Sequence, residues 1–123
     1  MVVGVDLVEI ERVERVLARH GQRFVERVFT PAELLYCRAR PFELAARFAA
    51  KEAVAKALGV GVRMLARDGI HWQEAEIVGD GRGRPLVHLY GRAAERAAEL
   101  GLTEWAVSLS HTREHAIAMV VAQ

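Results

Sequence analysis

The chain has 123 residues, and its 17 basic and 16 acidic side chains leave a formal net charge of +1 at pH 7. Hydrophobic residues make up 52% of it, which excludes a disordered or fibrous chain and favours one domain over residues 1–123. The near-neutral charge argues against a nucleic-acid partner. A single cysteine, Cys37, excludes a disulfide framework. The apolar runs are too short to cross a bilayer, so we expect a cytoplasmic protein without a membrane partner.

The predicted elements are a first strand, a run of helices, a pair of strands, one more helix and a last pair of strands. Thr30-Pro31-Ala32-Glu33 has the residues of a helix start, with Thr as N-cap and Glu closing a capping box. A glycine-rich turn over 79–84 separates two apolar segments and predicts a hairpin. We predict strands over 2–8, 70–78, 85–89, 105–109 and 115–121, helices over 9–20, 24–28, 31–37, 41–58 and 91–100, and a loop over 59–69.

This order predicts an α+β fold, with a largely antiparallel sheet and its helices on one side. The long helix over 41–58 is expected to pack on the sheet. It is rich in alanine, which favours helix formation and lets neighbouring elements approach closely.

Asp6 stands at the end of the first predicted strand. Side chains alternate across a strand, so Gly4 and Asp6 share a face, and Gly4 would leave room beside the carboxylate for a ligand. The same segment fits a second interpretation, because Asp6 followed by Glu9 has the pattern of a helix N-cap with its capping box. The local pattern leaves both interpretations open.

Glu52 and Lys56 lie four residues apart in the long helix and therefore share one face. A second stripe on this helix comprises Glu43, Arg47 and Lys51. Both stripes fit solvated ion pairs worth roughly a few tenths of a kcal/mol. Glu52 also fits a magnesium site, because two carboxylates from different elements together with phosphate oxygens are common ligands of that ion. Nearby Lys and Arg would then face the phosphates. Lys51 and Lys56 are the only lysines in a chain that otherwise uses Arg, which indicates a need for compact charge.

The two serines of the chain, Ser108 and Ser110, lie in one predicted strand and point the same way, and His111 opens the following turn. These residues fit an ordinary polar strand end, or contacts with phosphate or hydroxyl groups. A Ser/His nucleophile pair is less favoured, because no acid is placed to orient His111. The five histidines form no tight ligand cluster, which argues against zinc.

Arginines recur every three or four residues near the start of the chain and would form one basic stripe if the helix continued. The stripe fits an exposed face with internal ion pairs such as Glu11 with Arg15. It fits equally a docking surface for an acidic partner. Its members are Arg12, Arg15, Arg19, Arg23 and Arg27.

Three segments stand in order along the chain: Val3-Gly4-Val5-Asp6-Leu7, Arg47-Phe48-Ala49-Ala50-Lys51-Glu52-Ala53 and Ser108-Leu109-Ser110-His111-Thr112. Taken together they resemble the holo-acyl-carrier-protein synthases, a family of small 4′-phosphopantetheinyl transferases. The turn into Arg84-Pro85 is similar to that family's Gly-Lys-Pro stretch, with Arg in place of Lys.

The resemblance implies that the chain transfers the 4′-phosphopantetheine arm of coenzyme A to a serine of apo acyl carrier protein and releases adenosine 3′,5′-bisphosphate. It also implies the 4′-phosphopantetheinyl transferase fold and a trimer with active sites between subunits. Mg²⁺ would be held by Asp6 and Glu52, and Lys56 would stabilise or protonate the leaving group. The general base is left open between Asp6, His111 and a metal-bound water.

The resemblance implies two further sets of contacts. The catalytic residues would be Asp6, Glu52, Lys56 and His111. Coenzyme A would contact Arg47, Lys51, Lys56, Arg84, Pro85, Ser110 and His111. The carrier protein would contact Arg12, Arg19, Arg23 and Phe24.

Two other classes of function fit the same residues. A metal-dependent phosphoesterase would use the two carboxylates with water as the nucleophile. A non-catalytic binding module would use the arginine stripe to hold an acidic protein or RNA, and it would tolerate substitution of Asp6 or Glu52.

Overall fold

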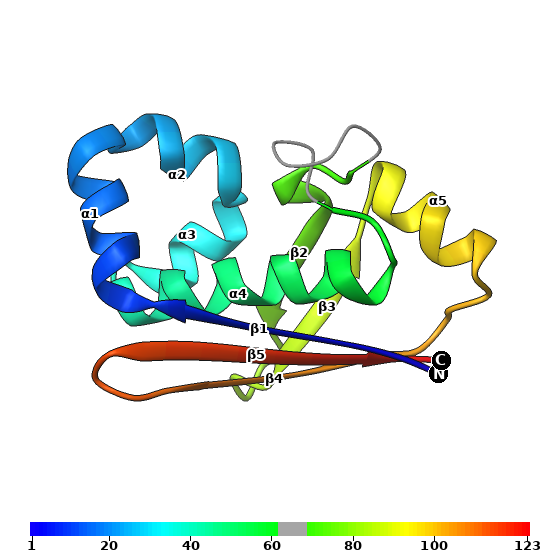
Figure 1. The fold of residues 1–123 in the computed structure, drawn as a ribbon. Helices are drawn as coiled ribbons and strands as arrows, with labels where there is room; N and C mark the ends of the chain where they lie inside the picture. The colour runs from blue at the N-terminus through cyan, green and yellow to red at the C-terminus, as the bar shows by residue number, and fades with distance from the viewer. Residues whose placement is uncertain (62–68) are drawn as a thin grey trace.

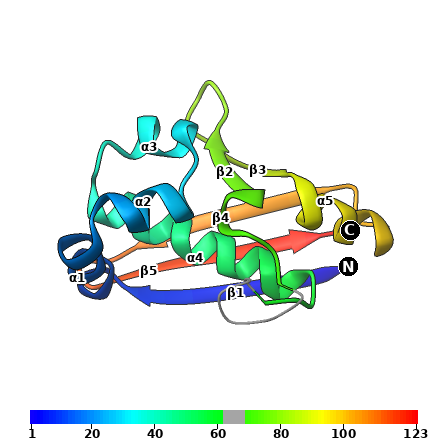
Figure 2. The ribbon, with the colours of Figure 1, turned by 90° about the horizontal axis from the view of Figure 1, so that it is seen from above.

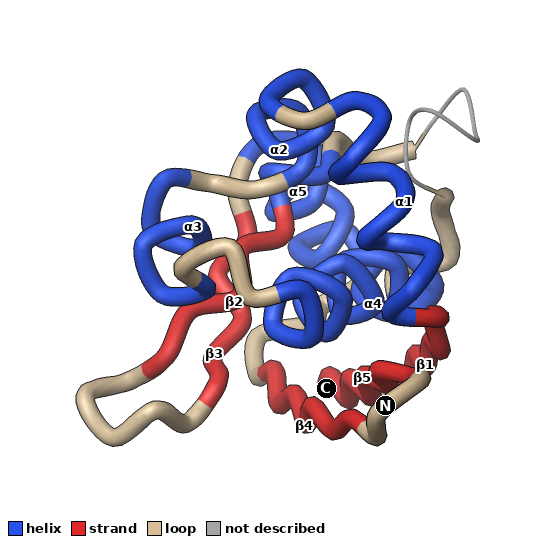
Figure 3. Tube along the Cα trace, turned by 90° about the vertical axis from the view of Figure 1, so that its left-hand side faces the viewer, coloured by secondary structure: helices blue, strands red, loops and turns tan. Residues whose placement is uncertain are grey.

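The computed structural model describes residues 1–61 and 69–123 and has the expected α+β architecture. A three-stranded sheet forms one layer, and the helices lie on one side of it (Figure 1, Figure 3). The elements are β1 (Val2–Glu9), α1 (Ile10–His20), α2 (Gln22–Val28), α3 (Pro31–Cys37), α4 (Pro41–Ala57), a 3₁₀ turn (Trp72–Glu74), β2 (Ala75–Gly79), β3 (Pro85–Leu89), α5 (Gly91–Glu99), β4 (Trp105–His111) and β5 (His115–Ala122). The part of the predicted loop over 62–68 lies outside the described residues.

The strands form two antiparallel sheets rather than one. In the larger sheet β5 is central, so that Ala118 lies opposite Asp6 of β1 on one side and opposite Leu109 of β4 on the other. β2 and β3 pair separately as a hairpin. The strand predicted from residue 70 begins only at Ala75, because the preceding turn is closed by a hydrogen bond from the His71 amide to Glu74 (2.7 Å). Figure 2 shows α4 running along the larger sheet.

The approach of α4 to β1 is close enough to exclude a side chain at Gly4. A Cβ there would overlap the backbone carbonyl of Ala53. The facing helix positions Ala49, Ala53 and Ala57 are buried small residues. Gly4 therefore allows backbone to meet backbone, and the expectation that it leaves room for a ligand is wrong.

The structure decides between the two interpretations of Asp6. Asp6 lies within β1, and α1 begins at Ile10 with Glu9 as its N-cap residue, which makes no side-chain capping bond among the described residues. The N-cap interpretation of Asp6 is therefore wrong. The predicted capping box of α3 is confirmed, since Thr30 Oγ1 accepts from the Glu33 amide (3.3 Å) and Glu33 Oε1 accepts from the Thr30 amide (2.9 Å).

The face of the larger sheet opposite α4 carries exposed apolar side chains. Val3 is 61% exposed and Met119 is 48% exposed. The exposed apolar residues on the β1 and β5 strands of this outer face are Val3, Val5, Leu7, Ile117 and Met119. Among the described residues, no helix is both long and apolar enough to span a membrane.

Replacing Gly4 by Ala tests the close approach. We expect Gly4→Ala to lower the free energy of unfolding by about 2–3 kcal/mol, because the helix backbone must move away from β1. Gly81→Ala is the matched control, since a Cβ at Gly81 meets nothing within 4 Å. Urea unfolding of both variants at one protein concentration measures the difference, and equal midpoints would contradict the tight contact.

Candidate active site

Asp6 of β1 and Lys56 of α4 form an ion pair between the sheet and the helix. Lys56 Nζ donates to Asp6 Oδ1 at 2.8 Å and to the Val5 carbonyl at 3.1 Å. The Asp6 side chain is only 11% exposed, whereas that of Lys56 is 56% exposed. Glu52 and Lys56 share one face of α4 through their i, i+4 spacing, and this face is directed toward the Asp6 carboxylate. The close approach of α4 to β1 at Gly4 brings the helix and the strand together here.

Glu52 lies beside Asp6 and is partly buried there. Burial, followed by the adjacent Asp6 carboxyl, raises the pKa of Glu52 from 4.5 to about 7. Lys56 and Arg12 of α1 oppose this rise. A partly buried carboxyl with a raised pKa beside a second carboxyl is typical of sites that bind a cation or move a proton.

These residues fit a magnesium ion. Among the described residues, Asp6 Oδ2 is one of two buried side-chain polar atoms without a hydrogen-bond partner. Its free lone pairs and the adjacent Glu52 carboxyl provide oxygen ligands from two elements. No group of three or more His, Cys, Asp or Glu side chains suited to a metal occurs within residues 1–61 and 69–123. Two carboxylates suffice for Mg²⁺, because this ion keeps several waters and takes phosphate oxygens as further ligands.

A second group of the predicted residues surrounds a cavity of about 380 Å³ between α4 and the β2–β3 hairpin. Arg47, Arg84 and Pro85 line it together with Ser108. Arg47 is buried; its Nη1 donates to Glu43 Oε2 at 2.5 Å, and its Nε has no partner among the described residues. A buried guanidinium with a free donor beside a second arginine favours an anion in this cavity.

Tyr36 and Glu43 also line this cavity, and neither was assigned to a ligand from the sequence. The guanidinium of Arg47 lies 4.5 Å from the centre of the Tyr36 ring, a cation–π contact. Tyr36 comes from α3, so only the tertiary fold brings it here. Ser108 lines the cavity too, and the sequence had indicated a phosphate or hydroxyl contact for it and for Ser110. Ser110 does not line the cavity.

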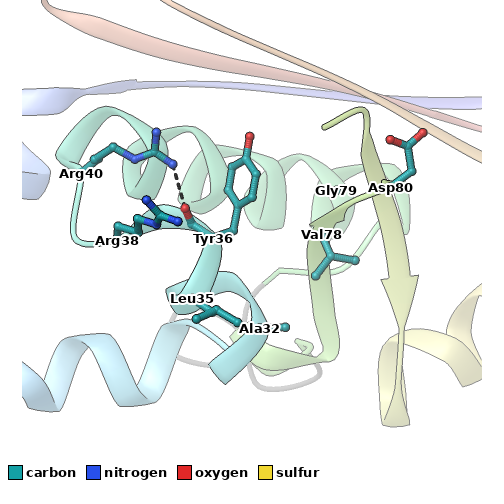
Figure 4. Close-up of a pocket in the computed structure, with 8 residues that line it drawn as sticks. All are labelled: Ala32, Leu35, Tyr36, Arg38, Arg40, Val78, Gly79 and Asp80. Atoms are coloured by element: carbon teal, nitrogen blue, oxygen red, sulfur yellow. Dashed lines mark hydrogen bonds between the residues drawn. The ribbon is translucent and has the colours of Figure 1, made fainter. Parts of the chain in front are cut away.

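Tyr36 also borders a neighbouring cavity of about 590 Å³, in which α3 and the α3–α4 turn face the end of β2 (Figure 4). Arg38 and Arg40 line it, with Asp80 on the hairpin side. Arg40 Nη2 donates to the Tyr36 carbonyl at 2.7 Å. Sequence reasoning missed these two arginines, whose only local signal is the Arg-Ala-Arg run before the Pro41 helix start.

Lys51, which the sequence assigned to a phosphate, has a different role. Its side chain is fully buried, and Nζ contacts Glu33 Oε1 (2.7 Å), the Ala75 carbonyl (2.8 Å) and the Trp72 carbonyl (3.1 Å). These three acceptors use its three donors, so the phosphate assignment is wrong for this geometry. Burial lowers the pKa of Lys51, and Glu33 opposes that shift. Glu33 Oε2 also accepts from the Ile77 amide (2.8 Å), so the pair ties α3, α4 and β2 together.

His111 lies at the end of β4 and stacks on Phe42, with 4.6 Å between the ring centres. Both residues border a cavity of about 550 Å³, together with Glu14 and Arg113. Ser110 is exposed on β4. Neither Ser110 nor His111 lines the cavity that contains Arg47.

A groove of about 610 Å³ lies where α1, α2 and α4 meet. Phe24, Phe48 and Trp72 form its apolar floor; the Phe48 and Trp72 ring centres are 4.7 Å apart, and those of Phe24 and Phe48 are 5.9 Å apart. Arg23 and Arg27 line it as well. Arg12 and Arg19, also assigned to a partner, are exposed on α1 and do not line this groove.

A comparison with known families identifies the class of this protein. The sequence model of the 4′-phosphopantetheinyl transferase superfamily matches residues 2–120. The chain belongs to that superfamily. The holo-[acyl-carrier-protein] synthase of Herpetosiphon aurantiacus is 51% identical over 123 residues, which cover 98% of this chain and 97% of the relative. The holo-[acyl-carrier-protein] synthase of Dehalococcoides mccartyi is 50% identical over 98% of this chain and 96% of the relative.

Solved structures agree with this assignment. Helicobacter pylori holo-[acyl-carrier-protein] synthase in complex with coenzyme A matches with a TM-score of 0.87 and 30% identity, over 98% of this chain and 99% of the other. The Neisseria meningitidis holo-[acyl-carrier-protein] synthase matches with a TM-score of 0.86 and 34% identity, over 100% of this chain and 99% of the other. The family resemblance inferred from the sequence is thereby confirmed.

The new role of Lys51 is tested by a double-mutant cycle with Glu33. Lys51→Met leaves a buried charge unpaired and should lower the free energy of unfolding by about 3–5 kcal/mol. The double variant Lys51→Met/Glu33→Gln should lose less than the sum of the two single variants. Arg15→Met is the control: Arg15 is exposed on α1 and its ion pair with Glu11 spans 3.8 Å, so the expected change is below about 1 kcal/mol. A normal unfolding midpoint for Lys51→Met, with a raised KM for coenzyme A, would restore the phosphate contact.

Proposed function

We propose that this chain transfers the 4′-phosphopantetheine arm of coenzyme A to a serine of apo acyl carrier protein in a Mg²⁺-dependent reaction, releasing adenosine 3′,5′-bisphosphate. The observation that carries the proposal is the adjacent pair of carboxyls, Asp6 and Glu52, with a buried oxygen left without a donor. The relatives named holo-[acyl-carrier-protein] synthase and the coenzyme A complex of one of them support the substrates. The cytoplasm is the proposed compartment, in keeping with the free thiol of Cys37.

Asp6 and Glu52 would hold the ion, which when bound supplies positive charge to the diphosphate and lowers the barrier to attack on phosphorus. Lys56, one turn further along α4, is placed to contact a phosphate or leaving oxygen beside the same carboxylates. The proton of the attacking serine needs an acceptor, for which Asp6 and His111 are the candidate side chains.

The cavity around Arg47 would hold the nucleotide portion. Arg47, Arg84 and Pro85 surround it, and the aromatic ring of Tyr36 forms part of its wall. Arg38 and Arg40 of the neighbouring cavity add two cations for a further phosphate group.

We propose a trimer that completes the active site between subunits, a number that rests on the family resemblance. Two features of the structure support association of copies. Arg47 and Glu52 lie on different sides of α4, so the anion cavity and the carboxylate pair are separate within one chain. The outer sheet face is also too apolar to be left in water without a role. We propose that copies of the chain cover this face and bring the two half-sites together. Light scattering measures the mass of the assembly.

The groove lined by Phe24 and Phe48 is the proposed docking site of the carrier protein. Its apolar floor suits the apolar side of a helix, and Arg23 and Arg27 suit acidic residues beside it. Arg12 and Arg19 extend the basic surface along α1.

Mass spectrometry of apo acyl carrier protein incubated with coenzyme A and Mg²⁺ tests the reaction. The expected product is the carrier protein heavier by one phosphopantetheine arm. Glu52→Gln keeps the shape of the side chain but removes its charge, and we expect a loss of turnover of at least about 10²-fold with an unchanged unfolding midpoint. Hydrolysis of coenzyme A without a gain in carrier mass would indicate a phosphoesterase, and no reaction at all would indicate a binding module.

The docking site is tested by reversing one charge in the groove. Arg23→Glu should raise the KM for the carrier protein roughly tenfold and weaken its salt dependence, while the KM for coenzyme A stays unchanged. Arg15→Glu is the control, since Arg15 is exposed on α1, forms an ion pair with Glu11 (3.8 Å) and is not among the residues that line the groove. Steady-state kinetics against both substrates gives the answer. Equal effects of the two variants would place docking elsewhere.

A further inference from the structure

Lys56 occupies a cation position at the carboxylate pair. Its ammonium donates to Asp6 Oδ1 at 2.8 Å and to the Val5 carbonyl at 3.1 Å. The side chain is 56% exposed, so little packing holds it in this position. Its place is set by these two acceptors, and one of them belongs to a proposed metal ligand.

The two oxygens of Asp6 are in different situations. Oδ1 accepts from Lys56, whereas Oδ2 is buried and lacks a hydrogen-bond partner within the described residues. Glu52 lies beside this carboxyl, and Arg12 of α1 adds positive charge near Glu52. Within the described residues, no hydrogen bond or ion pair joins Arg12 to Asp6. A divalent ion that binds Asp6 and Glu52 would lie within a few ångströms of the ammonium, and like charges at that distance repel strongly.

We propose that Lys56 is the resident counter-ion of Asp6 in the metal-free chain, and that a divalent cation displaces its ammonium toward the substrate phosphates. The proposal rests on the proposed function, because it takes Asp6 and Glu52 as the metal ligands. Lys56 thereby has two positions, one holding Asp6 in place before the metal binds and one contacting the phosphate afterwards. The long, exposed side chain allows the move without repacking of α4.

The two lysines make the exchange observable without an activity assay. In protein labelled with ¹⁵N-lysine, two side-chain ammonium signals are expected, one from Lys51 and one from Lys56. Titration with MgCl₂ in the absence of coenzyme A should move or broaden the Lys56 signal, because its bond to Asp6 is lost. The Lys51 signal should stay in place, since its three acceptors lie in the core. A Lys56 signal that is unmoved at saturating Mg²⁺ overturns the exchange.

Calorimetric titration of Mg²⁺ into two variants gives the second measurement. Lys56→Gln removes the competing cation and should tighten Mg²⁺ binding roughly tenfold. Arg12→Gln is the matched control, because it removes a nearby charge that makes no ion pair with Asp6 among the described residues. The logarithm of the Mg²⁺ affinity should change less than half as much as in Lys56→Gln. Equal tightening in the two variants overturns the exchange.

The outcome separates this inference from the proposed function. If the wild-type protein modifies the carrier protein and binds Mg²⁺ but Lys56 stays on Asp6, the proposed function stands and the exchange is overturned. If the wild-type protein neither binds Mg²⁺ nor modifies the carrier protein, both the proposed function and the exchange are overturned.

Discussion

The contact between α4 and the inner face of β1 is the constraint on which the rest of the structure depends. With no side chain at Gly4 and small ones at Ala53 and Ala57, the helix backbone lies directly on the strand. The same approach brings Glu52 to Asp6 and takes both partly out of water, which raises the pKa of Glu52 to about 7. The contact that stabilises the fold therefore also concentrates negative charge at the candidate site.

Two ion pairs on α4 show how a structural pair differs from a site. The Lys51–Glu33 pair is buried, and every donor of its ammonium has an acceptor within the fold. The Lys56–Asp6 pair is partly exposed, and it leaves one carboxylate oxygen unpaired and a second carboxyl beside it. A satisfied network resists change, whereas an unsatisfied one gains free energy from a ligand that completes it.

Much of the fold could be predicted because it depends on local spacing. The i, i+4 rule put Glu52 and Lys56 on one helix face, and strand alternation put Asp6 on the face of Gly4. That Asp6 and Glu52 share one site was implied only by the family resemblance, because local spacing does not relate a strand to a helix. The same rule failed for Lys51, since helical spacing defines a face but not what covers it, and here α3 and the β2–β3 hairpin cover that face. Arg38 and Arg40 were missed for the same reason, because their cavity exists only when α3 lies beside the end of β2.

The apolar outer face of β1 and β5 has a consequence for how the protein behaves on dilution. If copies of the chain bury this face, folding and association are linked by mass action, and the apparent melting temperature rises with protein concentration. A melting temperature of such a protein has meaning only at a stated concentration. Dilution would separate the half-sites before it unfolded the chain, so specific activity would fall while the helical signal remained.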